Sequence, residues 1–344
     1  MTRRIAHLQF GTDGGTERFM LRLAQAFARN GAQQVFALRP GQPIQPEAES
    51  LGPVMTGKVL RRTPLGLWQA ARMRRLIADW RPDVVMAWRA PAARLMPHWD
   101  CVKVVRLGDY PAHLRHFDGI DAIVANVPSV RDTCRDLGWT GQIHLISNFP
   151  PAEMAEPLDR SLLHTPEAAT VVCAANRFAG SKGMDTLVDA MTRVPDPFLW
   201  LVGDGPDRAA LEAQVDRAGL RDRTRFAGWV TDPVPYLRAA DICVVPSRRE
   251  PLGNAMLDAW RAGVPVIATR FEGAVWAGRD RENLLFADLD AADQIAAAIA
   301  ELQGDPVLGA RLVEGGRRTL EDRFSEASVV GAYFKLFDSL RGLP

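Results

Sequence analysis

Apolar and polar residues follow two patterns that alternate along this chain. Short apolar runs rich in β-branched residues predict strands, and longer segments with apolar residues every three or four positions predict helices. In the first part of the chain the predicted strands are Ile5–Phe10, Val35–Leu38, Val84–Ala87, Val102–Leu107, Ala122–Ala125 and Ile143–Ile146. A helix over Glu17–Asn30 follows the first strand, and residues 40–57 are predicted to form a loop. Strands that alternate with helices predict a parallel, doubly wound sheet.

A second alternating pattern begins after Asn148–Ala152, a segment expected to link two domains. Its predicted strands are Val171–Ala175, Phe198–Val202, Arg223–Ala227, Ile242–Val245 and Val264–Ala268. Its predicted helices are Met184–Arg193, Ala209–Ala218, Tyr236–Ala240, Ala255–Ala262, Ala291–Leu302, Val307–Phe324 and Glu326–Leu340. The fold class is therefore α/β, with two Rossmann-like doubly wound domains, 1–150 and 151–324, facing across a cleft. In such folds ligands bind at the carboxyl ends of the strands.

The composition is ordinary for a soluble α/β protein, with 47% hydrophobic and 24% charged residues. The 344 residues suffice for two domains, and the four cysteines are scattered without a CxxC pair, as expected of reduced thiols. No apolar run approaches the roughly 18 residues of a membrane span, and the N-terminus leads directly into a strand without a signal peptide. We therefore expect a cytoplasmic protein.

Charge is unevenly distributed along the chain. Residues 1–150 carry 20 Lys and Arg against 12 Asp and Glu, a net charge of +8, and the remaining residues carry 22 against 29, a net charge of −7. Within residues 58–81 one acid, Asp79, faces seven bases, which are Lys58, Arg61, Arg62, Arg72, Arg74, Arg75 and Arg81. Apolar residues interleave with them: Leu65, Leu67, Trp68, Met73, Leu76, Ile77 and Trp80. Two interpretations stay open, a core-packed helix with a solvated basic face, or a contact with anionic lipid or a phosphorylated acceptor.

The most informative stretch runs from Pro246 to Thr269. A strand end is followed by a short loop and by a helix that Leu252, Gly253 and Asn254 open. Because a helix N-terminus presents free N–H groups and partial positive charge, it suits a phosphate. Two acids, Glu250 and Asp258, flank this point with seven residues between them, and acids suit sugar hydroxyls. Phosphate and hydroxyl partners together predict a nucleotide-sugar site.

This stretch resembles the E-x7-E signature of retaining glycosyltransferases with the GT-B fold, of the family 4 type. The matching residues are Pro246, Ser247, Glu250, Gly253, Asp258, Ala259, Ala262, Gly263, Pro265 and Val266. Asp258 stands where that family usually has Glu, which shortens the reach toward the ribose by one methylene. The resemblance implies that Glu250 touches the donor sugar and Asp258 the ribose. It also implies that the C-terminal helix, about 325–344, packs back on the first domain.

Other segments extend the resemblance. Gly14 and Gly15, in the sequence Gly-Gly-Thr-Glu-Arg, match an element that approaches the donor diphosphate, and Arg177 and Lys182 match the family's diphosphate-binding pair. Fixed cations aimed at a departing diphosphate stabilise the charge that develops there. Gly203 belongs to a tight Gly-Asp-Gly-Pro turn, and Val230 to a segment that lies near the nucleotide base in the family.

One family residue is missing. The strand corresponding to Val102–Leu107 usually ends in His-Asp, but here Gly108 stands in place of the His and Asp109 follows in register. If this register holds, Gly108 leaves space near the donor sugar, Arg106 or Asp109 supplies a substitute polar contact, and Gly108→His blocks the native donor. The alternative is that the register slips and His113 or His116 takes the role.

We predict no metal and no cofactor beyond the nucleotide-diphospho-sugar that serves as co-substrate. No Asp-x-Asp ends a strand of the first domain, and Asp288-Leu-Asp290 precedes a helix as a capping segment. The resemblance implies a retaining glycosyltransferase for a glycan or lipid-linked, anionic acceptor, as in bacterial lipopolysaccharide, polysaccharide or glycolipid synthesis. A peripheral contact with the cytoplasmic face of the inner membrane would fit.

Three rival functions remain at this point: a non-catalytic nucleotide-sugar-binding subunit, a GT-B sugar-nucleotide epimerase, and an NAD-dependent dehydrogenase. The dehydrogenase is disfavoured because no GxGxxG with an acid about twenty residues later is present. The donor base and sugar, the acceptor and its linkage, and the oligomeric state are not determined by the sequence.

Overall fold

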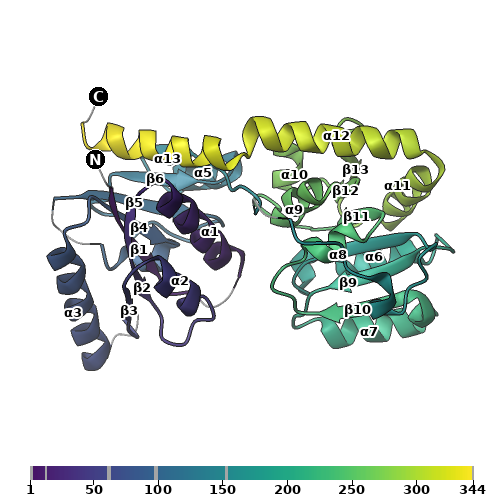
Figure 1. Cartoon of the computed structure of the whole chain (residues 1–344), viewed down its shortest axis with the longest axis horizontal. Coiled ribbons are helices and arrows are strands. Elements are labelled where there is room, and N and C mark those ends of the chain that lie inside the picture. The colour runs from purple at the N-terminus through teal and green to yellow at the C-terminus, as the bar shows by residue number, and fades with distance from the viewer. Residues whose placement is uncertain (1–2, 12–13, 60–62, 97–99, 152–153, 343–344) are drawn as a thin grey trace. The chain divides into compact units, whose positions relative to one another are not determined.

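The computed structural model describes residues 3–11, 14–59, 63–96, 100–151 and 154–342. The chain forms two compact units: unit 1 comprises residues 1–148 and 326–344, and unit 2 comprises residues 149–325. The sequence analysis placed these boundaries at 150/151 and 324/325. Each unit contains its own parallel sheet, and helices pack against its faces (Figure 1).

Unit 1 is built on a seven-stranded sheet with the strand order β3-β2-β1-β4-β5-β6-β7, and every pair is parallel. The strands are β1 (Arg4–Gln9), β2 (Gln33–Leu38), β3 (Val54–Thr56), β4 (Val84–Trp88), β5 (Val102–Leu107), β6 (Ala122–Ala125) and β7 (Gln142–Leu145). The central strands β1, β4, β5 and β6 are buried along nearly their whole length, which explains why they appear in the sequence as continuous apolar runs.

The helices of unit 1 are α1 (Gly15–Arg29), α2 (Gln45–Leu51), α3 (Pro64–Trp80), α4 (Ala90–Ala93), α5 (Pro128–Asp136) and α13 (Glu326–Leu340). The prediction of a loop over residues 40–57 was wrong, because this segment contains α2 and the edge strand β3. Both elements are too short to show a clear periodicity of apolar residues, and the Pro and Gly residues around them are typical of loops. Of the basic run 58–81, Arg61 and Arg62 lie outside the described residues.

The C-terminal helix α13 packs on the first helix of unit 1 (Figure 1). The ring of Phe27 on α1 stacks on Phe334 at 5.2 Å between centroids and meets Tyr333 edge-on at 5.7 Å. Three ion pairs border this contact: Arg3–Asp338, Arg29–Glu326 and Arg341–Asp83. Helix α13, at the C-terminal end of the chain, therefore completes the hydrophobic core of unit 1, which also contains the N-terminal strand β1.

Unit 2 contains a six-stranded parallel sheet with the order β10-β9-β8-β11-β12-β13. Its strands are β8 (Val171–Ala175), β9 (Phe198–Val202), β10 (Thr224–Gly228), β11 (Ile242–Val245), β12 (Val266–Thr269) and β13 (Leu285–Ala287). Its α-helices are α6 (Met184–Met191), α7 (Arg208–Arg217), α8 (Val234–Arg238), α9 (Asn254–Ala262), α10 (Glu272–Ala277), α11 (Ala292–Gly304) and α12 (Pro306–Arg323). The described residues of unit 2 also form the 3₁₀ turns η1 (Arg160–Leu163), η2 (Gly180–Lys182) and η3 (Arg221–Arg223). The sequence analysis missed α10 and the edge strand β13, both too short to carry a period.

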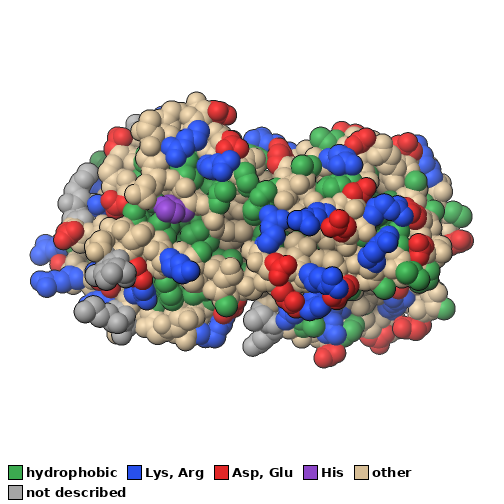
Figure 2. Space-filling view, turned by 90° about the horizontal axis from the view of Figure 1, so that it is seen from above, with side chains coloured by type: hydrophobic (Ala, Val, Ile, Leu, Met, Phe, Trp, Pro, Cys, Tyr) green, Lys and Arg blue, Asp and Glu red, His purple; other side chains and the backbone are tan. Residues whose placement is uncertain are grey.

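Acidic and basic side chains are intermixed on the visible surface of unit 2 (Figure 2). On α12, for example, Arg317 pairs with Glu314 and Glu321, and Arg318 also pairs with Glu314. Exposed pairs of this kind contribute little stability each. Within the described parts of the chain, no helix is both long enough and apolar enough to cross a membrane.

Candidate active site

In unit 2, an ion pair joins two of the residues that the sequence singled out. The Nζ atom of Lys182, on η2, lies 2.7 Å from Oε2 of Glu250, in the loop after β11. Both side chains are largely buried, with 19% and 15% exposed, respectively. Ser247 donates a hydrogen bond to the same carboxylate oxygen at 3.0 Å, and Asn176, after β8, approaches it at 3.5 Å. A cation, a carboxylate and two neutral polar groups thus meet at the carboxyl ends of adjacent strands, where α/β folds bind ligands.

The backbone around Gly183 holds Lys182 in this position. Gly183 has a φ of +64°, and a Cβ atom there would collide with the carbonyl oxygen of Pro246. The N–H groups of Arg248 and Arg249 both donate to the carbonyl of Ser181, at 2.9 and 3.2 Å. The loop that carries Glu250 is therefore bonded directly to the turn that carries Lys182.

Arg248 holds the same two loops together through its side chain, and the sequence analysis did not identify it. Its guanidinium donates to both carboxylate oxygens of Asp185, at 2.8 and 2.7 Å, and to Asp290 at 2.5 Å. Burial opposes ionisation of Asp185, but the hydrogen bonds and charge of Arg248 outweigh it, and the pKa of Asp185 falls below its usual value. The hydrogen bond with Asp185 likewise raises the pKa of Arg248. Asp290, which its sequence position suggested to be a helix-capping residue, therefore also binds the side chain of Arg248.

The N-terminus of α9 lies next to Glu250. Gly253 precedes the helix with a φ of +84° and provides no side-chain cap, while Leu252 is buried and Asn254 begins the helix. Gly273, on α10, packs so tightly against this loop that a Cβ atom there would collide with the carbonyl of Leu252. Glu272 accepts a hydrogen bond from the N–H of Glu250 at 3.4 Å. The loop is therefore held in place from two directions, and the helix end carries no side chain of its own as a cap.

Asp258 lies one turn further along α9 and is half-buried. Its charge acts on Cys243 of β11: burial of the thiol, followed by the nearby Asp258 carboxylate, raises the pKa of Cys243 to about 12. Cys243 is therefore a neutral, inert thiol, as expected for a buried structural cysteine. The contact of Asp258 with the ribose stays a prediction.

The predicted turn at Gly203 borders the same strand edge. The N–H of Gly203 donates to the carbonyl of Gly228 at 2.8 Å, and a Cβ atom on Gly203 would collide with the carbonyl of Asn176. Gly203 therefore allows the loops after β8 and β9 to approach closely. Val230 is half-buried just beyond β10, and its neighbour Trp229 is 51% exposed. Arg177 is exposed beside Asn176, so its side chain is accessible to a ligand.

In unit 1, the glycine-rich turn leads into α1, with Gly14 before the helix and Gly15 as its first residue. Glu17, in the first turn, is fully buried, and its carboxylate lies 3.5 Å from Nη2 of Arg89, which follows β4. Arg89 has a φ of +73°, an unusual conformation for an arginine. It also donates to the hydroxyl of Thr16 at 3.4 Å. No sequence pattern pointed to Arg89, because its contacts with Glu17 and Thr16 depend on β1 and β4 pairing side by side in the sheet.

The interpretation of Arg106 as a sugar contact is not supported by its position, because the side chain is only 1% exposed. Its guanidinium hydrogen-bonds to Asn148 and lies over the rings of Phe19 and Trp88, at 4.8 and 5.6 Å from their centroids. A Cβ atom on Gly108 would collide with this guanidinium. The space that the sequence analysis assigned to a donor is therefore filled by Arg106.

The other polar candidates on this strand edge are placed differently. Asp109 is exposed, and its carboxylate accepts a hydrogen bond from the N–H of Tyr110 at 2.8 Å. His113 and His116, the candidates under a shifted register, lie with their rings edge to face at 5.5 Å. Their role as donor-sugar contacts under a shifted register stays a prediction.

Comparison with known proteins defines the class first. Over 99% of both chains, the fold matches that of sucrose-phosphate synthase from Thermosynechococcus elongatus, with a TM-score of 0.82 and 20% identity. It also matches HepE from Anabaena in complex with UDP and glucose, over 98% of this chain and 100% of that chain, with a TM-score of 0.79 and 20% identity. The fold is the GT-B fold of glycosyltransferases.

Sequence similarity then gives the family. Residues 13–151 match the model described as Glycosyltransferase Family 4, and residues 169–305 match that described as Glycosyl transferases group 1. The chain is also 41% identical to the lipopolysaccharide core biosynthesis glycosyltransferase LpsD of Rhizobium meliloti (strain 1021), over 97% of this chain and 98% of that protein. The chain therefore belongs to the family 4 glycosyltransferases.

Proposed function

We propose that this glycosyltransferase transfers a hexose or pentose from a nucleotide-diphospho-sugar to a glycan or lipid-linked acceptor of bacterial lipopolysaccharide synthesis, with retention of anomeric configuration. The observation that carries the proposal is the ion pair between Lys182 and Glu250 at the strand ends of unit 2. Lys182 provides a cation that can bind a phosphate, and Glu250 provides a carboxylate that can bind sugar hydroxyls. The similarity to a lipopolysaccharide core glycosyltransferase supports the acceptor class.

In the proposed reaction, Lys182 and the exposed Arg177 stabilise the negative charge that develops on the departing diphosphate. The bond between the sugar C1 and the phosphate oxygen breaks while the acceptor hydroxyl attacks from the same face. The leaving phosphate accepts the proton of that hydroxyl. Glu250 holds the donor sugar, and Asp258 the ribose. Since two side-chain cations supply the charge stabilisation, the proposal assigns no metal to the reaction.

A donor screen tests this proposal. The protein is incubated with UDP-, GDP-, ADP- and CMP-sugars, and slow hydrolysis is followed with and without EDTA. We expect hydrolysis of one donor class, unchanged by EDTA, with the sugar released first as the anomer that the donor carried. Tight binding of a donor without any turnover would instead indicate a non-catalytic subunit, and a change of configuration at another carbon would indicate an epimerase.

We further propose that the acceptor is anionic and that unit 1 binds it during a peripheral contact with the inner face of the membrane. The net charge of +8 in residues 1–150 supports this part of the proposal. Exchange of an anionic acceptor for an uncharged one of similar size should raise KM steeply at low salt and less at high salt.

A further inference from the structure

Helix α3 packs on the rest of unit 1 through a narrow stripe of small and medium-sized residues. The buried members of this stripe are Gly66, Ala70, Met73 and Ile77. Four other apolar residues of the helix are 42% to 62% exposed: Leu65, Leu67, Trp68 and Leu76. The interpretation of a core-packed helix is therefore only half correct, because two of the seven interleaved apolar residues, Met73 and Ile77, are buried. Arg74 lies at the margin of the buried stripe, since it follows Ala70 by four positions and precedes Ile77 by three.

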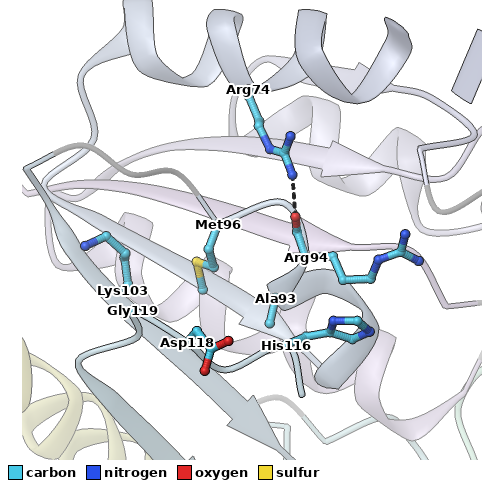
Figure 3. A pocket seen from close by; sticks show the side chains of 8 residues that line it. All are labelled: Arg74, Ala93, Arg94, Met96, Lys103, His116, Asp118 and Gly119. Atoms are coloured by element: carbon cyan, nitrogen blue, oxygen red, sulfur yellow. Dashed lines mark hydrogen bonds between the residues drawn. The ribbon is translucent and has the colours of Figure 1, made fainter. Parts of the chain in front are cut away.

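A cavity of about 330 Å³ opens beside Arg74, within unit 1 (Figure 3). The polar residues of its lining come from four separate segments of the chain. Arg74 belongs to α3, Arg94 to the segment after α4, and Lys103 to β5, and the loop before β6 supplies His116 and Asp118. These side chains meet only because the sheet and α3 bring their segments together.

The lining carries an excess of positive charge. Arg74, Arg94 and Lys103 are cations and Asp118 is an acid, so the net charge is +2 with His116 neutral. Nη2 of Arg74 donates a hydrogen bond to the carbonyl oxygen of Arg94 at 2.5 Å, which uses one of the five donors of the guanidinium. Within the described parts of the chain, neither Arg74 nor Lys103 forms an ion pair with an acid. The other donors of Arg74 and the ammonium group of Lys103 are therefore available to an anion.

Lys103 locates this cavity away from the edge of the sheet where substrates bind. It is the second residue of β5 and pairs with Val85, the second residue of β4. The carboxyl end of β5 lies at Leu107, four residues or about 13 Å further along the strand. Arg89 and Asp109 follow the carboxyl ends of β4 and β5. Because α/β folds bind their substrates at the carboxyl ends of the strands, a ligand in this cavity would occupy a second, separate site.

We propose that the cavity binds a small phosphorylated sugar, with Arg74 and Lys103 holding the phosphate and a sugar hydroxyl donating to the carboxylate of Asp118. Arg and Lys bind phosphate oxygens through charge-assisted hydrogen bonds. Asp118 repels a phosphate but accepts hydrogen bonds from hydroxyls, so it favours a ligand that carries both groups. The cavity volume is at the lower end of the range of about 300–1,000 Å³ that is usual for ligand sites, and this suits a monosaccharide better than a nucleotide-sugar. The inference goes beyond the proposed function, because it requires neither the donor nor any residue of unit 2.

Isothermal titration calorimetry on the full chain tests this site with three probes: glucose 6-phosphate, inorganic phosphate and glucose. We expect saturable binding of glucose 6-phosphate, and affinities about tenfold lower or less for the other two, because each lacks one of the two groups that the site recognises. Arg74→Gln and Lys103→Gln should each weaken the binding of glucose 6-phosphate about tenfold or more, since each removes a charge-assisted hydrogen bond. Asp118→Asn should reduce the preference for glucose 6-phosphate over inorganic phosphate, because it removes a charge that repels the phosphate.

Arg75→Gln is the matched control, because Arg75 is the exposed neighbour of Arg74 on α3 and does not line the cavity. It should bind glucose 6-phosphate like the wild type, and circular dichroism shows whether each variant is folded. The absence of saturable glucose 6-phosphate binding would overturn the proposal, as would the same affinity in the wild type, Arg74→Gln and Lys103→Gln. Equal affinities of the wild type for inorganic phosphate and glucose 6-phosphate would also overturn it, because the cavity would then bind an adventitious ion only.

A phosphorylated sugar has two sources, a free metabolite and a phosphorylated residue of the acceptor. Transfer to a phosphorylated acceptor oligosaccharide, measured with and without saturating glucose 6-phosphate, separates them. A raised KM for the acceptor indicates that the cavity holds part of the acceptor, and an unchanged KM indicates a free ligand. Donor hydrolysis without acceptor or glucose 6-phosphate should be the same in the wild type, Arg74→Gln and Lys103→Gln. A protein that binds glucose 6-phosphate at this site but hydrolyses no donor would refute the proposed transferase function and leave this site standing.

Discussion

The guanidinium of Arg106 fills the space into which a side chain at Gly108 would extend, two residues further along the chain. Arg106 is buried, its guanidinium lies over the rings of Phe19 and Trp88, and it hydrogen-bonds to Asn148. The glycine is therefore required by a neighbour within unit 1. This relationship replaces the hypothesis that Gly108 makes room for an unusual donor sugar.

We expect Gly108→Ala to destabilise unit 1 by about 1–3 kcal/mol, because the new methyl group must displace a buried, hydrogen-bonded guanidinium. Gly108→His, which adds a larger side chain, should destabilise unit 1 further. Thermal and urea unfolding measure the effect. Gly331→Ala, at a helical position where a Cβ atom meets nothing within 4 Å, is the matched control and should be neutral or slightly stabilising. A stable Gly108→Ala protein would show that Arg106 moves at little cost.

Lys182→Ala and Glu250→Gln should each lower kcat by about 10²–10³, because each removes a preorganised charge from the strand edge of unit 2. Initial rates of sugar transfer or donor hydrolysis provide the measurement, with circular dichroism to show that the fold survives. Lys335→Ala, which removes an exposed lysine of α13, should leave the rate unchanged. Near-normal rates in both site variants would refute the assignment of this pair to the active site.

Arg248→Ala should impair turnover although Arg248 is a positioning residue. Its side chain fixes the loops of Lys182 and Glu250 through Asp185 and Asp290, and a misplacement of about 1 Å can cost about 10²-fold in rate. We expect a raised KM for the donor and a lowered kcat, with partial rescue by Arg248→Lys, which keeps the charge but loses the bidentate geometry. A purely structural role would lower the melting temperature and leave the KM of the surviving folded enzyme unchanged.

Stability should fall in mild acid because of His7. Burial lowers the pKa of His7 from 6.5 to about 4, although its hydrogen bond with Gln34 opposes the shift. Trp88 donates to Nδ1, so the neutral ring donates from Nε2 to Gln34. Since the folded pKa is lower than the unfolded one, the unfolded state binds the proton first. Stability is therefore lost as pH falls from about 6.5 to about 4, by up to about 3 kcal/mol.

Urea unfolding at several pH values in this window measures that loss. The variant His7→Gln keeps polar atoms but cannot titrate, so its stability should change less with pH than that of the wild type. Parallel pH profiles for the two proteins would show that another group controls acid unfolding.

The sequence by itself determined the alternation of buried strands and amphipathic helices, and with it the fold class. It also located α9, because Gly263 ends that helix at a φ of +77° and the apolar period between Gly253 and Gly263 is local. Lys182 and Glu250 could be selected because their motifs are short and contiguous. These features depend on residues within one or two turns of each other, which is the range over which a sequence pattern is informative.

The tertiary structure decided which side chains meet. Arg248 reaches Asp185 across 63 positions and Asp290 across 42, and no local pattern relates residues at such separations. Arg106, a charged residue in an apolar strand, looked available for a ligand until packing against Trp88 and Asn148 showed it buried. The exposed Leu and Trp residues of α3 likewise fit a core helix by composition. Whether an apolar side chain is covered depends on which other segments fold against it, and that is a property of the assembled chain.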